Sequence, residues 1–183
     1  MTDPASVSGD ERLRLFLALR VPDDFLGEIE RWQRSELRGV RLVPREHLHV
    51  TLAFLGHRPA GELDAIVGTL HAAAAGAGEI RLTPVRYRET RSVGMLVLED
   101  KGGCASVLAS RLHELLEGLG VYRRERRPWL PHLTVARWRQ RPRLRPELPS
   151  VGTFVPSDAA AYLSRLHPGG ARYEVLESVA LGG

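Results

Sequence analysis

A pattern of histidine, apolar residue, threonine, apolar residue and alanine occurs twice in this chain of 183 residues. The first copy is His49-Val50-Thr51-Leu52-Ala53 and the second is His132-Leu133-Thr134-Val135-Ala136, so the two histidines lie 83 positions apart. Solenoid repeats recur every 20 to 50 residues or so, and this spacing is longer. A near-repeat at almost half the chain length instead indicates a duplicated unit.

The secondary structure expected from the sequence mixes helices and strands. Apolar residues at helical spacing, with Gly and Pro at the ends, predict helices over 22–35, 59–75 and 104–119. Apolar runs and alternating segments predict strands over 13–19, 40–43, 47–55, 79–88, 92–99, 130–138, 153–156, 159–166 and 173–181. The His-Thr pattern falls on a strand in both halves, after the first helix and after the third.

This order predicts an α+β fold, bilobal, in which a duplicated unit has pseudo-twofold symmetry. Each half is expected to contribute one antiparallel sheet. The two sheets then face a central cleft, with the helices outside. Residues 12–183 are expected to form a single bilobal domain, which suits a chain of this size, and the polar residues 1–11 are expected to be a disordered tail.

Strand geometry decides which side chains of the repeated pattern face the cleft. Alternate residues of a strand share a face. In the first copy, His49, Thr51 and Ala53 therefore point one way. The intervening apolar residues, Val50, Leu52 and Phe54, are expected to point the other way, toward a helix. The second copy repeats the arrangement, so two histidines and two threonines are expected to meet in the cleft.

Two histidines and two threonines in one cleft suit transfer at phosphorus. Imidazole titrates near neutral pH, so one ring can accept a proton from a nucleophile while the other gives a proton to a leaving group. Threonine hydroxyls can donate hydrogen bonds to phosphate oxygens, where charge accumulates. The pattern does not say which of His49 and His132 is the donor, because the two copies look alike.

A metal centre is the main chemical alternative for the two histidines. Neither cysteine nor a well-spaced carboxylate stands near either copy to complete a zinc ligand set. The single cysteine, Cys104, excludes an internal disulfide, and it is expected to be a small, partly buried residue near the start of a helix. We therefore expect no metal and no cofactor.

The charge of the chain favours an anionic partner. The formal net charge is +4, and all but Lys101 of the 26 basic residues are arginine, whose planar fork binds phosphate. Nucleic acid is the commonest partner of basic proteins. The sequence shows no apolar run long enough for a membrane helix and no secretion signal, so a cytoplasmic protein that does not bind membranes is expected.

These residues and their flanks resemble the 2H phosphoesterase superfamily, and within it the RNA 2',3'-cyclic phosphodiesterases of bacteria and archaea, historically called 2'-5' RNA ligases. The segments that carry the resemblance are RLFLAL at 14–19, HLHVTLAFLG at 47–56, PHLTVAR at 131–137 and YLSRLHPGGARYEVLESVAL at 162–181. The resemblance implies a bilobal fold that hydrolyses a 2',3'-cyclic phosphate at an RNA end to a 2'-phosphomonoester without a metal.

The resemblance also implies roles for individual residues. His132 would accept a proton from water and His49 would protonate the departing 3'-oxygen. Thr51 and Thr134 would hold the phosphate, and Arg137 matches a family residue that contacts it. Under strict alternation Arg137 is out of phase with His132, so the strand would have to end or bulge nearby. Weak 2'-5' ligation by the reverse reaction is a further expectation.

Other residues are candidates for RNA contact. Arg137, Arg139, Arg141, Arg143 and Arg145 alternate and, if extended, would form a basic strip. Arg123, Arg124, Arg126 and Arg127 could add to that strip. Aromatic residues that could stack on a base are Trp129, Trp138, Tyr122 and Phe16, with core packing favoured for Phe16. Among the remaining histidines, His47 is expected at the cleft rim, His71 and His113 at surface or boundary positions, and His57 and His167 in turns.

Two alternative functions stay open on the sequence alone. One is a 2H phosphodiesterase that acts on a small cyclic nucleotide or an ADP-ribose cyclic phosphate. The other is a non-catalytic RNA-binding module, which would not need both histidines and both threonines intact. No obligate protein partner is expected, and a monomer is expected because the duplication supplies both halves of the site.

Overall fold

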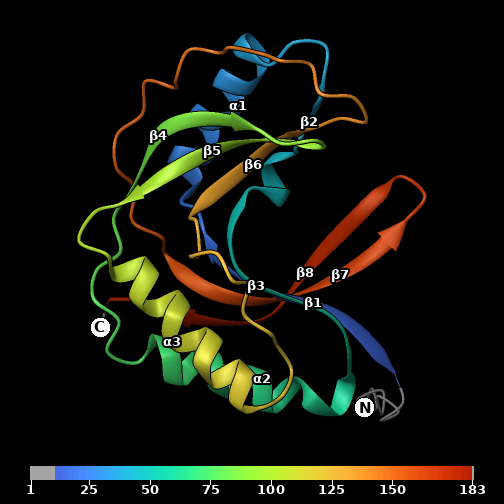
Figure 1. The fold of residues 1–183 in the computed structure, drawn as a ribbon, viewed down its shortest axis with the longest axis vertical. Coiled ribbons are helices and arrows are strands. Elements are labelled where there is room, and N and C mark those ends of the chain that lie inside the picture. The colour runs from blue at the N-terminus through green and yellow to red at the C-terminus, as the bar shows by residue number, and fades with distance from the viewer. Residues whose placement is uncertain (1–10, 183) are drawn as a thin grey trace, which may run out of the picture.

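Two four-stranded antiparallel sheets form the framework of the computed structural model, which describes residues 11–182. The first sheet has the order β3-β1-β7-β8 and the second the order β2-β6-β5-β4 (Figure 1). The first comprises β1 (Arg12–Arg20), β3 (His49–Pro59), β7 (Asp158–His167) and β8 (Gly170–Ala180). The second comprises β2 (Arg41–Leu42), β4 (Leu82–Glu89), β5 (Val93–Asp100) and β6 (His132–Arg137). The expected α+β fold is confirmed.

Three α-helices cover the outer faces of the sheets. They are α1 (Asp23–Glu36), α2 (Leu63–Ala74) and α3 (Cys104–Gly118), with short 3-10 helices η1 (Arg45–His47) and η2 (Ala60–Glu62). Helices α2 and α3 pack side by side against the first sheet, whereas α1 lies over the second (Figure 1). Cys104 is the first residue of α3 and is partly buried, as the sequence predicted.

The expectation of one sheet from each half is wrong, because the halves exchange strands. The first sheet combines β1 and β3 with β7 and β8 from the other end of the chain, and β2 joins the second sheet. The reason lies in β1, which is buried on both faces: Leu15 and Leu17 lie in the main core, and Phe16 lies in a small cluster on the cleft side. The backbone N–H and C=O groups along both edges of such a buried strand need hydrogen-bond partners, which β3 and β7 supply.

The duplication is nevertheless visible in the order of elements. A shift of 83 residues carries β1, α1 and β3 approximately onto β5, α3 and β6. Helices α1 and α3 each pack against the sheet that holds the motif strand of the other unit. Helix α3 contacts β3, and Gln33 of α1 donates a hydrogen bond to a carbonyl oxygen in β6. The two motif strands, β3 and β6, contact one another between the sheets.

Most expected elements are present, with two local differences. The strand expected at 153–156 reduces to a single bridge between Phe154 and Leu82, because Pro156 cannot donate to a ladder. Strand β3 continues beyond its expected end at Gly56, which adopts a left-handed φ of 68°, and reaches Pro59.

Two expectations concern the ends of the chain and its surroundings. Residues 1–10 of the expected disordered tail lie outside the described residues, and Glu11, the last of that tail, accepts a hydrogen bond from the backbone N–H of Ala60 at 2.8 Å. Across residues 11–182, no helix has the length and apolar character needed to cross a membrane.

Candidate active site

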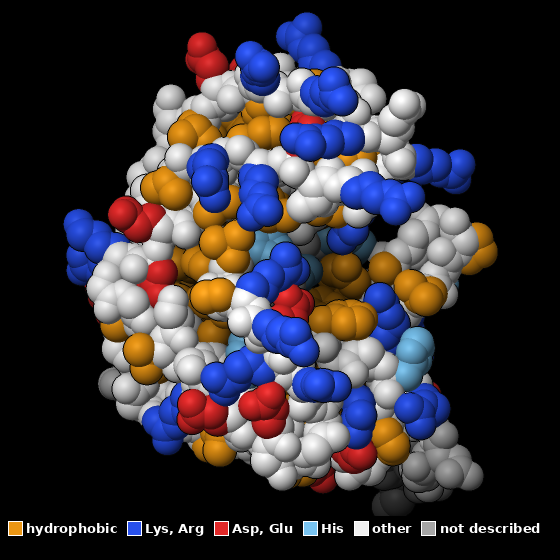
Figure 2. Space-filling view, in the orientation of Figure 1, with side chains coloured by type: hydrophobic (Ala, Val, Ile, Leu, Met, Phe, Trp, Pro, Cys, Tyr) orange, Lys and Arg blue, Asp and Glu red, His pale blue; other side chains and the backbone are white. Residues whose placement is uncertain are grey.

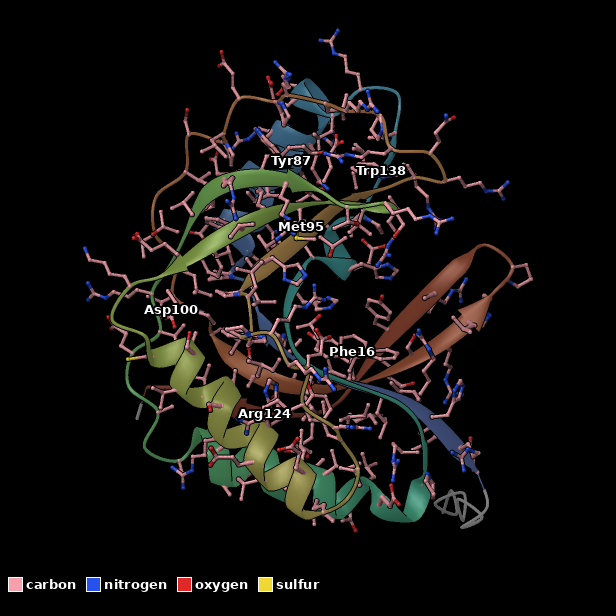
Figure 3. The ribbon with its side chains drawn as sticks, in the orientation of Figure 1. Phe16, Tyr87, Met95, Asp100, Arg124 and Trp138 are labelled. Carbon is pink, nitrogen blue, oxygen red and sulfur yellow. The ribbon has the colours of Figure 1, made fainter. Side chains whose placement is uncertain are left out.

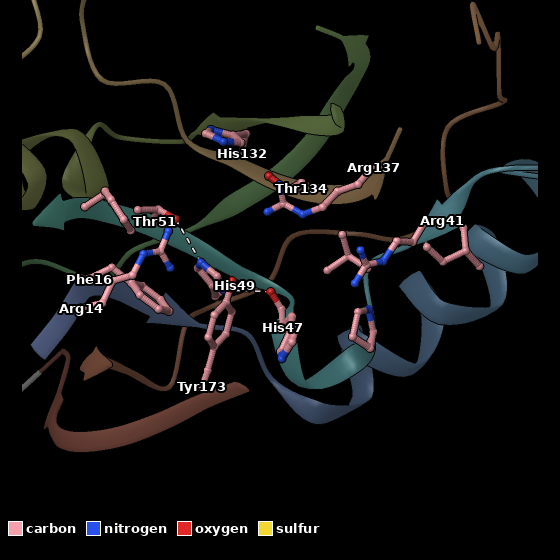
Figure 4. Close-up of a pocket in the computed structure, with 14 residues that line it drawn as sticks. Arg14, Phe16, Arg41, His47, His49, Thr51, His132, Thr134, Arg137 and Tyr173 are labelled. Atoms are coloured by element: carbon pink, nitrogen blue, oxygen red, sulfur yellow. Dashed lines mark hydrogen bonds between the residues drawn. The ribbon is translucent and has the colours of Figure 1, made fainter. Parts of the chain in front are cut away.

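A pocket between the two sheets collects the residues that the repeated pattern singled out (Figure 4). The first motif strand contributes His49 and Thr51, and the second contributes His132, Thr134 and Arg137. The other lining residues come from β1, β2, η1, β3, β8 and the link between β2 and η1: Arg14, Phe16, Arg41, Leu42, Val43, Pro44, His47, Phe54 and Tyr173. The structure thus brings together all five residues expected at the phosphate, although their separate roles stay predictions.

A β-bulge at the same place in each motif strand explains how Arg137 reaches the pocket. In β6, Thr134 pairs with Met95 and Ala136 with Gly94, which leaves Val135 as an extra residue. The bulge shifts the alternation by one position, so Arg137 comes onto the face of His132 and Thr134. This is the bulge that the sequence required if Arg137 was to contact the phosphate.

The equivalent bulge in β3 overturns part of the expected face assignment. Thr51 pairs with Ala18 and Ala53 with Leu17, so Leu52 is the extra residue. Ala53 is therefore buried rather than facing the cleft, and Phe54 lines the pocket instead of packing on a helix. The second copy behaves alike, with Ala136 fully buried. Phe54 and Arg137 consequently occupy matching positions in the two copies.

Both histidines are oriented by the same local hydrogen bond. His49 Nδ1 lies 2.8 Å from the carbonyl oxygen of His47, and His132 Nδ1 lies 2.8 Å from that of Leu130. A carbonyl oxygen only accepts, so each Nδ1 carries the proton and each ring presents Nε2 on its other side. The two rings therefore have the same tautomer when neutral, with a basic nitrogen available for chemistry in the pocket.

The ring of His49 is packed against two aromatic side chains. Its ring stacks on Phe16 with centroids 4.9 Å apart, and Tyr173 approaches it edge-on at 5.7 Å. Phe16, drawn in the centre of Figure 3, is itself buried, as the sequence favoured. Burial lowers the pKa of His49 to about 4, with a smaller contribution from the nearby charges of His47, His132 and Arg137.

Thr51 connects the first motif internally. Its hydroxyl lies 3.1 Å from His49 Nε2, which in the neutral ring accepts the hydrogen bond (Figure 4). Thr134 occupies the matching position on β6 and also lines the pocket. The site therefore offers two hydroxyl donors and two imidazoles from two facing strands, the set required for acid–base chemistry at an anionic group.

Three arginines supply positive charge at the pocket. Arg137 extends from β6, Arg41 from β2, and Arg14 from β1, where its guanidinium lies 4.7 Å above the ring centre of Phe54. Figure 2 shows histidine surface inside a hollow of this face, with Lys and Arg side chains around it. Burial lowers the pKa of His47, and the charges of Arg137 and Arg41 add to this lowering, whereas Glu46 opposes it. The pocket is thus suited to an anion.

Sequence reasoning missed several of these lining residues, though signals for two were present. Arg14 shares a face with Phe16 by strand alternation, and Tyr173 belongs to a segment that the family resemblance covers. Arg41 lies in a strand of two residues and had no signal, because only its pairing with Arg137 brings it to the site. His47, expected at the rim, lines the pocket and packs on Tyr173 with ring centroids 4.2 Å apart.

The basic strip expected after Arg137 does not form. Residues 138–157 make no regular strand, and the buried carboxylate of Glu89 holds this loop by accepting hydrogen bonds from Arg141 Nε and from the N–H groups of Arg143 and Leu144. Proline and the left-handed φ of 60° at Arg143 break the alternation. The strip is therefore a loop folded around one carboxylate.

Four other candidates for RNA contact, Arg127, Arg139, Trp129 and Trp138, are not among the residues that line the pocket. Arg127 is exposed and pairs with Glu125, and Arg139 is exposed in the loop after β6. Trp129 is partly buried, and its indole N–H donates to the carbonyl oxygen of Thr51 at 3.0 Å, which joins the two motifs. Trp138 likewise donates to the carbonyl oxygen of Thr90. Contact between these residues and RNA stays a prediction.

His113 was expected at a surface or boundary position, and that expectation is wrong. The residue is only 5% exposed, because it lies on the inner face of α3 between Leu112 and Leu116. Its Nε2 lies 2.8 Å from the carbonyl oxygen of Leu52, and its ring packs against Tyr122 with centroids 4.9 Å apart. A polar residue in a helix is expected at the surface, and the sequence does not show that the carbonyl oxygen of Leu52 would pair with this ring.

A second groove adjoins the pocket on the side of the β7–β8 hairpin. It shares Arg41, Pro44, His47 and Tyr173 with the pocket. Its further wall is the hairpin itself, which projects away from the body of the molecule (Figure 1) and carries His167 and Arg172. The pocket and this groove therefore adjoin, and the groove is lined by Arg41 and Arg172 together with Glu46.

Comparison with known proteins gives a consistent family. Residues 21–167 match the model of the 2'-5' RNA ligase superfamily. The RNA 2',3'-cyclic phosphodiesterase of Thermus thermophilus is 32% identical over 93% of this chain and 91% of its own length, and that of Methanocaldococcus jannaschii is 24% identical over 90% and 99%. The structure of E. coli LigT complexed with 3'-AMP superposes with a TM-score of 0.82, at 23% identity, over 94% of this chain and all of LigT.

Proposed function

The chain belongs to the 2'-5' RNA ligase superfamily, and from this premise we propose that it hydrolyses 2',3'-cyclic phosphate ends of RNA to 2'-phosphomonoesters. The observation that carries the proposal is the pair of histidines. Each has Nδ1 tied to a backbone carbonyl at 2.8 Å, and each lines the same pocket from a different sheet. Two matched imidazoles on opposite strands suit proton transfer at opposite ends of one reacting phosphate.

The proposed reaction needs one proton accepted and one donated. His132 Nε2 accepts a proton from water as the water oxygen attacks phosphorus. His49 Nε2 gives a proton to the 3'-oxygen as the P–O3' bond breaks, which leaves a 2'-phosphate and a 3'-hydroxyl. Solvent then restores both protonation states, so atoms and charge balance. Thr51, Thr134 and Arg137 stabilise the charge on the non-bridging oxygens.

The low pKa of His49 fits this role only when an anion is bound. By itself, a pKa of about 4 leaves the His49 ring neutral at pH 7. A phosphate held next to the ring favours the imidazolium, since an opposite charge within a few ångströms raises a histidine pKa. The substrate thus helps to protonate its own general acid.

The same groups support ligation in the proposed scheme. A 5'-hydroxyl that takes the place of water would attack the cyclic phosphate, give its proton to His132 and form a 2'-5' linkage as the 3'-oxygen leaves. No other group is required. The proposed mechanism uses no metal ion, and the EDTA treatment below tests that point.

An RNA chain, rather than a small cyclic nucleotide, is favoured by the adjoining groove. The nucleotide before the cyclic end would lie in this groove, because the groove shares four lining residues with the pocket. Arg172 lines this groove, and its guanidinium suits a phosphodiester of the RNA. A mononucleotide substrate would have no second phosphate to contact Arg172.

The decisive experiment uses EDTA-treated protein and a short RNA that ends in a 2',3'-cyclic phosphate. The 2'- and 3'-phosphate products are resolved for wild type, His49→Ala and His132→Ala, with His71→Ala as a control on the outer surface of α2. The proposal expects the 2'-phosphate from wild type and the control only. Equal RNA binding by all four proteins without turnover would instead favour a binding module.

A further inference from the structure

Each motif bulge is held by a buried polar side chain from a helix of the other repeat unit. Gln33, in α1, donates from Nε2 to the carbonyl oxygen of Val135 at 2.8 Å. His113, in α3, donates from Nε2 to the carbonyl oxygen of Leu52 at 2.8 Å. Val135 and Leu52 are the extra residues of the two bulges. The same device therefore occurs twice, once in each lobe.

These contacts are not required by the packing of the helices. Gln33 and His113 are 2% and 5% exposed, among otherwise apolar neighbours. A buried polar side chain costs stability unless it is hydrogen-bonded, and an apolar residue would fill either position without that cost. Each donates to the extra residue of a bulge, and the carbonyl oxygen of Val135 also accepts from the backbone N–H of Val43 at 3.0 Å, so Gln33 adds a second donor there. The one hydrogen bond that each of these buried side chains makes to a motif strand is thus made to the extra residue of its bulge.

The bulge decides which side chain follows the histidine and threonine into the pocket. In β6 that side chain is Arg137, and in β3 it is Phe54, over which Arg14 lies. Without the bulge, strict alternation would direct Ala136 and Ala53 into the pocket and turn Arg137 and Phe54 away. The orientation of the phosphate-facing arginine therefore depends on the conformation at Val135.

We propose that Gln33 and His113 are positioning residues of the active site, which fix the two bulges and thereby the residues that follow them. Gln33 acts through Arg137, and His113 acts through Phe54. Gln33 also donates to the carbonyl oxygen of Val43 at 3.0 Å, so it ties the β6 bulge to the segment that leads from β2 into η1. The inference rests on the proposed function for its catalytic consequence, but the positioning is measurable without turnover.

A double-mutant cycle separates positioning from mere folding. Gln33→Met removes the donor at nearly constant volume and is measured with Arg137 present and in the Arg137→Ala background. The readouts are the affinity for orthophosphate, which needs no turnover, and kcat/KM on the cyclic-phosphate RNA, both corrected for the folded fraction. If Gln33 acts through Arg137, the two changes are not additive.

The expected result is a loss of about 10-fold or more when Arg137 is present, since small misplacements of a binding group are costly, and less than about twofold in the Arg137→Ala background. An equal loss in both backgrounds would overturn the role of Gln33 and leave it a folding residue. If Gln33→Met does not fold, Gln33→Asn replaces it in the double-mutant cycle, because asparagine keeps the amide but is shorter by one methylene group.

His113 provides the matched control and its own test. His113→Leu acts on the other strand, so its effect should be the same with and without Arg137 but should disappear in a Phe54→Ala background. His113→Gln places an amide N–H near the position of Nε2 and should stay within about twofold of wild type. A His113→Gln variant as impaired as His113→Leu, or a His113→Leu effect that persists without Phe54, would overturn this half.

The two hypotheses fail in different ways. If wild type does not open the cyclic RNA, the proposed function fails, while the orthophosphate cycle still decides the positioning. If wild type is active and both cycles are additive, the function stands and the positioning inference is overturned.

Discussion

Arg41 in β2 and Arg137 in β6 stand directly opposite each other across the two strands, and both line the active-site pocket. Among the described residues, the ion pairs include neither guanidinium. Like charges directly opposite each other destabilise a sheet. An anion bound between the two side chains would therefore relieve the repulsion between them.

The first prediction concerns this arginine pair. Arg41→Ala or Arg137→Ala should weaken orthophosphate binding by about 10- to 100-fold, because each removes one charged donor of roughly 1.5–3 kcal/mol. The free energy of unfolding without phosphate should stay equal or rise by a few tenths of a kcal/mol. Calorimetric titration and urea denaturation measure the two effects. Arg31→Ala, on the exposed face of α1, serves as the control, and a matching loss of affinity there would contradict the assignment.

A second prediction concerns the protonation of His49. Its ring should titrate in the free protein with a pKa of about 4, far below the usual 6.5, because its ring is buried next to positive groups. Arg137→Gln removes one of those groups, and bound orthophosphate adds a negative charge, so each should raise this pKa. NMR titration of the ring protons follows both changes. A pKa of His49 near 6.5 that does not change when orthophosphate binds would contradict the account of substrate-assisted protonation.

The same shift predicts how stability depends on pH. The unfolded chain protonates this ring below about pH 6.5 and the folded chain only below about 4, so the unfolded state binds more protons between these values. His49 should therefore reduce the free energy of unfolding by about 3 kcal/mol in total as the pH falls through this window. His49→Gln cannot titrate. Urea denaturation at pH 7, 5 and 4 gives the free energy of unfolding of wild type and of His49→Gln. The difference between the two proteins should change by that amount over this range, and a difference that does not depend on pH would contradict the prediction.

The threonine hydroxyls give a fourth prediction. Thr51→Val and Thr134→Val keep the shape of the side chain but remove a donor to the phosphate, so kcat should fall by about 10²-fold in each. Thr51→Ser and Thr134→Ser keep the hydroxyl and should retain most of the activity. Steady-state kinetics on the cyclic-phosphate RNA measures all four variants. Valine and serine variants of equal activity would show that the hydroxyls do not contact the reacting group.

The groove along the β7–β8 hairpin gives a fifth prediction. Arg172→Ala should lower kcat/KM on an oligonucleotide that ends in a cyclic phosphate but leave kcat/KM on a cyclic mononucleotide unchanged, because only the longer substrate reaches the groove. The slope of log affinity against log salt for the oligonucleotide should decrease by about 0.7 for the one lost phosphate contact. Arg111→Ala, on α3, is the control. Equal losses on both substrates would place Arg172 at the reacting nucleotide instead.

Local sequence determined the elements and the chemistry of the site. The spacing of apolar residues specified the helices and most strands, and the repeated pattern placed His49, Thr51, His132 and Thr134 on strands with the correct faces. Those features need only the period of two of a strand and the residue types themselves. They are contained in a few consecutive residues and could therefore be read directly.

Only the tertiary structure decided the register beyond each threonine and the pairing of the sheets. The bulge at Val135 is held by Gln33, 102 residues away, and the bulge at Leu52 by His113, 61 residues away. The partner that turns Arg41 toward the pocket is Arg137, in a strand from the other half of the chain. A strand's face changes with a single extra residue, and hydrogen-bond partners distant in the sequence hold that residue in place. For this reason the pattern around each histidine was legible in the sequence, whereas the burial of His113 and Ala53 and the exposure of Phe54 to the pocket were not.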